Sequence, residues 1–273
     1  MTFEVGVNFP WAHCGHDFGP RPPAWAGAAP TDWAAIEREL RSLAQDGMRI
    51  VRWWILAGGV NYPCGADPLN VAERRGEQLI LRSAPPALPA AFVLDFEALL
   101  AACARAGVRL LPSLTSFELF LPIAEQRGGV LSRGRASWVL GESLEPFLDA
   151  VLEPLLDACA RAPSSLYAFE VINEPDWLVK GRADPYALSC FVEQACRRIA
   201  DRNLRATVGT LRASASWLTP GARRTLSRLA ERGAYVHQAH HYPSDERPTL
   251  PAASASPLGP CLLGELPTAR ASG

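Results

Sequence analysis

Apolar residues recur along the chain in two alternating patterns, short β-prone runs and longer stretches with helical spacing. Asp32 can cap a first helix at Trp33–Gly47, in which Ile36 and Leu40 share one face. The other predicted helices cover about Leu94–Ala106, Leu144–Ala162, Pro185–Arg202 and Ala222–Gly233. The predicted strands cover Thr2–Pro10, Met48–Leu56, Val108–Ser116, Leu166–Asn173, Ala206–Leu211, Tyr235–Tyr242 and Pro260–Leu266, with Gln78–Leu81 as a small additional strand. This alternation predicts βα units on a parallel α/β sheet, in one domain that covers residues 1–273.

The run that starts at Leu166 is the pattern of a strand buried on both faces, and it ends abruptly at Asn173, Glu174 and Pro175. Proline stops the ladder, and the amide of Asn173 can bond a substrate hydroxyl. In an α/β barrel the carboxyl ends of the strands form the catalytic rim, which is where Glu174 is expected. The alternative is a solvated loop carboxylate after an ordinary strand.

A second glutamate, Glu265, ends the last predicted strand and therefore points into the same mouth as Glu174. Cleavage of a glycosidic bond needs two such carboxyl groups, one protonated for the leaving oxygen and one ionised to attack or to activate water. Two ordinary rim charges remain the alternative.

The chain resembles the clan A glycoside hydrolases, and most of all family 5, the cellulase and mannanase-like group. The resemblance implies a (β/α)8 TIM barrel and a retaining mechanism on β-linked glucan or mannan-like chains, with Glu174 as general acid/base and Glu265 as nucleophile. It also implies that Asn173 holds the sugar's 2-hydroxyl and that Arg52 lies beside the nucleophile. The matching pieces, in family order, are Gly6-Val7-Asn8, Arg52, Asn173-Glu174-Pro175, His240-His241-Tyr242 and Gly264-Glu265.

The physical roles agree with this assignment. A guanidinium such as Arg52 lowers the pKa of a neighbouring nucleophilic carboxyl, and the Tyr242 hydroxyl can donate to it. The acid/base glutamate needs a raised pKa, which burial and the partner carboxylate would produce. His240 can bond Glu174 or a sugar hydroxyl. The alternatives are a barrel-interior ion pair for Arg52 and a satisfied core histidine for His240.

Aromatic side chains near the predicted strand ends are candidates for stacking against sugar rings, because those rings present flat C–H faces. Trp11, Trp54 and Trp177 are the first candidates, with Trp138 and Trp217 behind them. Core packing is an equally good interpretation for Trp53 and Trp54.

The His13, His16 and Asp17 cluster has only generic metal-ligand spacing, so a subsite or loop-bonding role is favoured over a metal site. No cofactor or metal is expected. The formal net charge of −1 and the pI near 6.5 give no electrostatic case for nucleic acid or an anionic membrane, which leaves a carbohydrate substrate as the expected partner.

Seven cysteines lack the spacing of a zinc or redox site, and no disulfide is predicted, although Cys14 and Cys64 could meet on the same rim. The chain begins at Met1 and enters a strand at once, which predicts a cytoplasmic protein, or a secreted one if a leader was removed.

Two departures from the family pattern stand out. Ser113-Leu114-Thr115-Ser116 replaces a histidine that the family often has at the end of the third strand. After Glu265 only Leu266–Gly273 remain, too few for the rest of an eight-unit barrel. The expectation is therefore a barrel without its last βα unit. Truncation is favoured over completion by another chain or a degenerate, inactive protein, and a non-catalytic carbohydrate-binding barrel is the rival function.

Overall fold

The fold is described from a computed structural model. The structure describes residues 4–13, 15–19, 30–56, 72–75, 78–81, 87–126, 130–211, 215–240 and 261–265.

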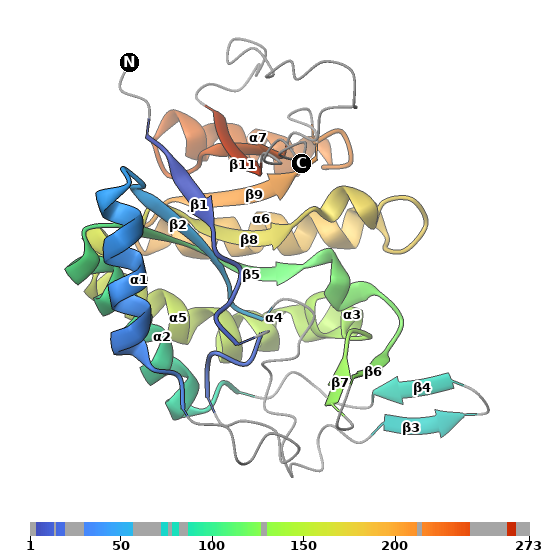
Figure 1. The fold of residues 1–273 in the computed structure, drawn as a ribbon. Helices are drawn as coiled ribbons and strands as arrows, with labels where there is room; N and C mark the ends of the chain where they lie inside the picture. Colours follow the sequence, from blue (N-terminus) through green and yellow to red (C-terminus); the bar gives the residue numbers. More distant parts are fainter. Residues whose placement is uncertain are drawn as a thin grey trace, which may run out of the picture.

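Seven parallel strands form one curled sheet (Figure 1), in the order β1-β2-β5-β8-β9-β10-β11. Neighbours in the sheet follow the order of the chain, as expected when each βα unit places the next strand beside the last. The predicted parallel α/β sheet is therefore confirmed, as part of a (β/α) barrel. The strands are β1 (Gly6–Asn8), β2 (Ile50–Trp54), β5 (Arg109–Ser116), β8 (Phe169–Asn173), β9 (Ala206–Thr210), β10 (His237–His240) and β11 (Cys261–Glu265).

Helices connect the strands and pack along one side of the sheet (Figure 1). The Asp32 carboxylate accepts a hydrogen bond from the Ala35 amide and caps the first helix, as predicted. The helices are α1 (Trp33–Gln45), α2 (Ala90–Ala106), α3 (Ala136–Val139), α4 (Leu144–Phe147), α5 (Glu153–Arg161), α6 (Pro185–Asp201) and α7 (Pro220–Glu231), with short 3-10 turns at Phe117–Phe120, Gly141–Ser143, Pro163–Ser165 and Pro175–Trp177. None of the described helices is long and apolar enough to cross a membrane.

The helix predicted at Leu144–Ala162 is interrupted by a π-helical turn, Leu148–Leu152, between α4 and α5. A π turn frees a backbone carbonyl from the usual ladder. Here the Ala150 oxygen accepts a hydrogen bond from the Leu88 amide, at 3.2 Å, just before α2. The interruption therefore joins two neighbouring helices through their backbones, a contact that helical periodicity does not predict.

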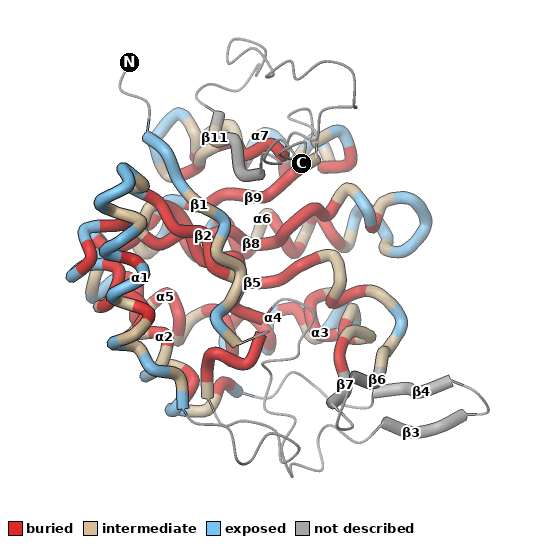
Figure 2. The backbone as a smooth tube through the Cα atoms, in the orientation of Figure 1, coloured by how far each residue is buried: buried red, intermediate tan, exposed pale blue. Residues whose placement is uncertain are grey.

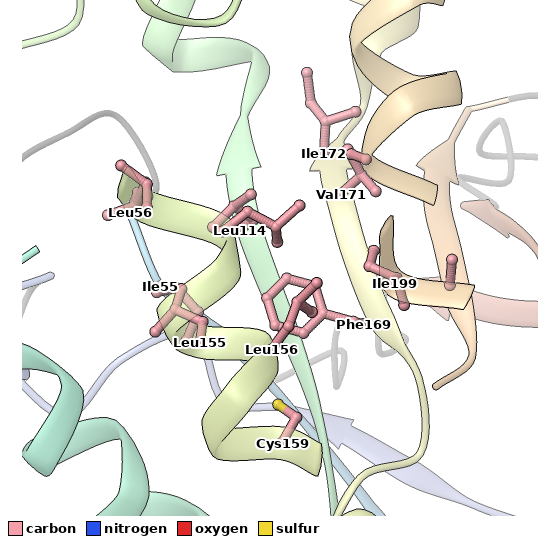
Figure 3. Close-up of a cluster of buried hydrophobic side chains, with 14 of the residues drawn as sticks. Ile55, Leu56, Leu114, Leu155, Leu156, Cys159, Phe169, Val171, Ile172 and Ile199 are labelled. Carbon is pink, nitrogen blue, oxygen red and sulfur yellow. The ribbon is translucent and has the colours of Figure 1, made fainter. Parts of the chain in front are cut away.

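The main hydrophobic core lies between the sheet and the helices (Figures 2 and 3). In Figure 3, Leu156 of α5 and Phe169 of β8 belong to this core, and both are fully buried. Trp53 is also fully buried and stacks on Phe9, so of its two open interpretations core packing is correct. The described cysteines Cys103, Cys159, Cys190 and Cys196 are unpaired thiols within helices, whereas Cys14 and Cys64 lie outside the described residues.

Two antiparallel hairpins lie on the side of the molecule toward which β5 and β8 point (Figure 1). One pairs β3 (Ala72–Arg75) with β4 (Gln78–Leu81), which confirms the small additional strand. The other, β6 (Ala124–Gln126) with β7 (Val130–Ser132), was not predicted. The expectations about the chain after Glu265 concern residues outside those described.

Candidate active site

Glu174 follows the last residue of β8, where the chain leaves the sheet. Its backbone has φ 50° and ψ 52°, the left-handed conformation, and its amide donates to the Gly209 carbonyl of β9 at 2.6 Å. The side chain is 7% exposed and its two oxygens have different partners. Oε1 lies 2.9 Å from His240 Nδ1, and Oε2 accepts from Trp177 Nε1 at 2.9 Å. Glu174 is thus a positioned, buried carboxyl rather than a solvated loop residue.

The turn that carries Trp177 is fixed to the next strand. The Asp176 carboxylate accepts a hydrogen bond from the Leu211 amide, at the end of β9, at 2.8 Å. Burial raises the pKa of Asp176, and the charge of Glu174 raises it further, against the lowering effect of its backbone hydrogen bonds. Pro175 begins this 3-10 turn, so the indole of Trp177 returns toward Glu174 three residues earlier.

Arg52, in the middle of β2, is bound by a glutamate that the sequence analysis missed. Arg52 Nε and Nη2 donate to the two oxygens of Glu170 at 2.8 and 2.6 Å, as a bidentate pair. Nη2 also donates to Asn173 Oδ1 at 2.7 Å, and Nη1 donates to Asn8 Oδ1 at 3.3 Å. Arg52 and Glu170 thus form a buried ion pair in the interior of the sheet, and the expected place of Arg52 beside the nucleophile stays a prediction.

A register shift brings Glu170 and Asn173 to the same guanidinium although they are three residues apart in β8. In a regular strand, side chains three apart point to opposite faces. The pairing of β8 with β9 shifts between Glu170 and Asn173, which resets the alternation. Asn173 also donates from Nδ2 to Ser116 Oγ, at 3.4 Å.

Burial and charge act in opposite directions on Glu170, which is fully buried. Burial raises the pKa of its carboxyl, but the Arg52 charge and hydrogen bonds, the nearby His240 ring and the Ser113 hydroxyl, which donates at 2.8 Å, together outweigh burial and lower the pKa overall. Glu170 is consequently an ionised carboxylate in the barrel interior at neutral pH.

Gln238 of β10 links this ion pair to His240. Its Nε2 lies 2.9 Å from Glu170 Oε2 and 3.1 Å from His240 Nε2. A continuous set of contacts therefore runs from Arg52 through Glu170, Gln238 and His240 to Glu174, which we call the interior polar network. Sequence reasoning missed Gln238 as well as Glu170. The available signal was a polar side chain two residues before His240 in a buried strand.

Gly209 of β9 leaves the space that this network needs. A Cβ atom at this position would lie 2.9 Å from Glu170 Oε1 and 3.0 Å from His240 Nε2. These distances are too short for real Cβ contacts, so any larger residue would displace one of the two side chains. The glycine is therefore part of the site although it has no side chain to contribute.

The aromatic candidates divide into rim and core residues. Trp177 is 42% exposed, and Trp54 is partly buried with Arg52 over its ring, 5.7 Å from the centroid. Trp11 packs edge-on against Trp54, with ring centroids 5.2 Å apart. Trp138 and Trp217 are buried in the core, so their prediction as reserve platforms is wrong, because no sugar can reach those ring faces.

Asp17 organises the loop after β1 instead of a metal site. Its carboxylate accepts from the amides of Ala12 and His13 and from Trp53 Nε1, the last at 3.0 Å. Among the residues that the structure describes, no group of three His, Cys, Asp or Glu could hold a metal ion. The loop-bonding interpretation is the one that these contacts support.

The second predicted carboxylate is placed by its backbone. Glu265 ends β11 and is in register with His240 on the neighbouring β10. Because parallel strands end at one edge of the sheet, Glu265 belongs to the same mouth as His240 and Glu174. Tyr242 lies outside the described residues. The structure thus brings together the side chains of Asn173, Glu174, Arg52, His240 and Trp177.

Comparison with known proteins gives matches in structure alone. A scan of family models and a search of curated sequences find no match to the chain. Among solved structures, β-mannanase from the blue mussel Mytilus edulis is 17% identical and superposes with a TM-score of 0.65, covering 97% of this chain and 78% of its own. The chain shares the fold of that β-mannanase. The resemblance to clan A, and to family 5 in particular, is confirmed at the level of the fold.

Two further structures agree with that match. β-1,4-Mannanase from the sea hare Aplysia kurodai is 16% identical, with a TM-score of 0.60, and the match covers 89% of this chain and 72% of that one. A family 5 xyloglucanase from Paenibacillus pabuli is 12% identical, with a TM-score of 0.51, and the match covers 96% and 71%.

Proposed function

We propose that the protein is a retaining glycoside hydrolase that cleaves β-linked oligo- or polysaccharides of the mannan or glucan type. Glu174 is the general acid/base and Glu265 is the nucleophile. Asn173 and the rim tryptophans Trp11, Trp54 and Trp177 bind the sugar. The observation that carries the proposal is the setting of Glu174 at the end of β8, buried and held through both oxygens.

The contacts of Glu170 and Glu174 support different roles for these two carboxyl groups. Glu170 is neutralised by a bidentate arginine, so it serves the architecture and is not available to exchange protons. Glu174 contacts an indole N–H and an imidazole nitrogen, which leave a carboxyl able to take up and release a proton. Glu265 ends the strand beside that of His240, and this backbone register supports its assignment as the nucleophile.

The structural neighbours support the proposed substrate class. The matched proteins include two β-mannanases and a xyloglucanase. β-Mannan and aryl β-mannosides are therefore the first substrates to test, followed by the corresponding glucans and glucosides.

Turnover of an aryl β-glycoside panel by Glu174→Gln and Glu265→Gln variants tests the proposal. We expect Glu174→Gln to lower kcat roughly 10²- to 10⁴-fold on poor leaving groups and much less on activated aryl groups, because the latter need little protonation. Glu265→Gln should abolish turnover of both classes. Glu142→Gln, on an exposed 3-10 turn, is the matched control and should match the wild type.

The stereochemistry of the first product completes the test. Proton NMR at early times should show the β-anomer, as required by two successive displacements. An initial α-anomer would exclude retention. Sugar binding without turnover would instead establish the non-catalytic carbohydrate-binding barrel.

A further inference from the structure

The contact between Gln238 and His240 joins the interior ion pair to the proposed acid/base. Gln238 Nε2 lies between Glu170 Oε2 and His240 Nε2, at 2.9 and 3.1 Å. All three side chains are nearly or completely buried. A side-chain amide nitrogen carries two hydrogens, so it can serve both neighbours at once.

Glu170 decides which way the Gln238 amide faces. An ionised carboxylate only accepts hydrogen bonds, and Glu170 is ionised because its bidentate contact with the Arg52 guanidinium, at 2.8 and 2.6 Å, helps to lower its pKa in spite of burial. Turning the amide over would bring Gln238 Oε1 against Glu170 Oε2, two acceptors without a proton between them. In the observed orientation Oε1 instead lies 3.3 Å from Thr207 Oγ1, whose single hydrogen also faces the Val236 carbonyl at 2.8 Å.

This orientation in turn decides the protonation of the His240 ring. The second amide hydrogen of Gln238 points at His240 Nε2, so that nitrogen must accept and cannot carry a proton of its own. The ring proton is then on Nδ1, which donates to Glu174 Oε1 at 2.9 Å.

We propose that Gln238 is a positioning residue that holds His240 as the neutral Nδ1–H tautomer facing Glu174. This inference rests on the proposed function for its catalytic meaning. A neutral donor orients the Glu174 carboxyl and still lets it take up a proton. An imidazolium at the same distance would hold Glu174 as a carboxylate and weaken it as an acid.

Nitrogen NMR of the histidine rings tests the proposal without any substrate. The chain has five histidines, so ¹⁵N-histidine labelling gives a small set of signals, and His240→Asn identifies those of His240 by their loss. In the wild type at neutral pH we expect Nδ1 to be protonated and Nε2 unprotonated. A protonated Nε2 in the wild type overturns the proposal outright.

Gln238→Met removes both amide hydrogens and retains a side chain of similar length. We expect His240 Nε2 to gain a proton in this variant, since the amide hydrogen of Gln238 that opposed it is gone and the carboxylates of Glu170 and Glu174 lie nearby. An unchanged, unprotonated Nε2 would show that Gln238 does not control the ring. Gln194→Met makes the same change in α6, outside the network, and should leave the His240 signals as in the wild type.

Steady-state kinetics supply the second readout. Gln238→Met should lower kcat roughly tenfold on poor leaving groups, with little change in KM and little loss on activated aryl glycosides. An equal loss on all substrates would contradict a role through the acid. If wild type turns nothing over but shows the expected His240 tautomer, the proposed function fails while the control of His240 by Gln238 stands.

Discussion

The protein uses arginine–carboxylate pairs in two settings, inside the curled sheet and on the helical surface. Inside, Arg52 and Glu170 are 3% and 0% exposed and hold a bidentate geometry. Outside, Arg198 of α6 and Arg202, the residue that follows this helix, form ion pairs with the α4–α5 segment, which is partly exposed (Figure 2). The acidic partners on that segment are Glu145, Asp149, Glu153 and Asp157.

The difference lies in what each pair does for the molecule. Water screens the surface set, which therefore contributes little to the free energy of unfolding. Both charges of the interior pair lose their hydration on folding, which costs free energy. Their mutual attraction offsets that cost only while both partners are present. What the molecule gains inside is fixed geometry, because Glu170 also orients Gln238 and Arg52 also holds Asn173.

The largest effect should follow from breaking the interior pair. Arg52→Met leaves Glu170 buried without its cation, and we expect a loss of about 3–5 kcal/mol in the free energy of unfolding. Arg198→Met, on the surface, should cost less than about 1 kcal/mol. Urea unfolding followed by circular dichroism measures both.

A double variant separates the charge from the shape. Arg52→Met with Glu170→Met removes both charges, so it should be more stable than Arg52→Met alone. If the single and double variants were equally stable, the unpaired charge of Glu170 would not be the cause of the lost stability in Arg52→Met. Activity should be lost in both, because Asn173 loses Arg52 in each variant and Gln238 also loses Glu170 in the double variant.

A smaller loss is expected from Gly209→Ala. The new methyl would press on Glu170 Oε1 and His240 Nε2, and we expect a cost of about 1–3 kcal/mol for the forced shift. Activity should fall further than stability suggests, since the displaced groups belong to the interior polar network. Gly221→Ala, at a glycine without a positive φ where a new Cβ would meet only Thr219 Oγ1 at 3.9 Å, is the matched control. Wild-type kinetics in Gly209→Ala would contradict the close contacts of this position with Glu170 and His240.

The smallest effect is on the pH dependence of stability. Because the folded-state pKa of Glu170 is lowered from 4.5, its contribution is present above that value and is lost as pH falls through the lower folded-state pKa. Asp17 and Asp176, whose pKa values burial raises, act in the opposite sense. The measurement is therefore a difference: between pH 7 and acid, the wild type should lose more stability than the Arg52→Met and Glu170→Met double variant. If the stability of the wild type and of the double variant fell equally with pH, the predicted contribution of Glu170 would be refuted.

Most of the fold could be predicted from the sequence, because strand and helix periodicities differ and alternate along the chain. The predicted strands at Val108–Ser116 and Ala206–Leu211 match β5 and β9 to within one residue at each end. The hairpin β6–β7 was missed, since its strands of three residues are too short for any periodicity to register.

The candidate site was predicted at its edge and missed in its interior. Glu174 was found because a motif places it after a buried strand. Glu170 was overlooked because a carboxylate inside an apolar strand can be recognised as part of a site only when its cationic partner is known. That partner, Arg52, lies 118 residues away in the sequence. The register shift in β8 is a property of strand pairing, so no single-strand pattern could reveal that Asn173 faces inward too.

The left-handed backbone at Glu174 affects how substitutions there should be interpreted. Any residue with a Cβ sustains roughly 1–2 kcal/mol of strain in this conformation, whereas glycine does not. Glycine at this position would relax the chain while deleting the carboxyl, so a gain in thermal stability could accompany complete inactivity. Natural or engineered variants that melt later would then be poor guides to function, and a screen that selects only for heat resistance would not protect this carboxyl.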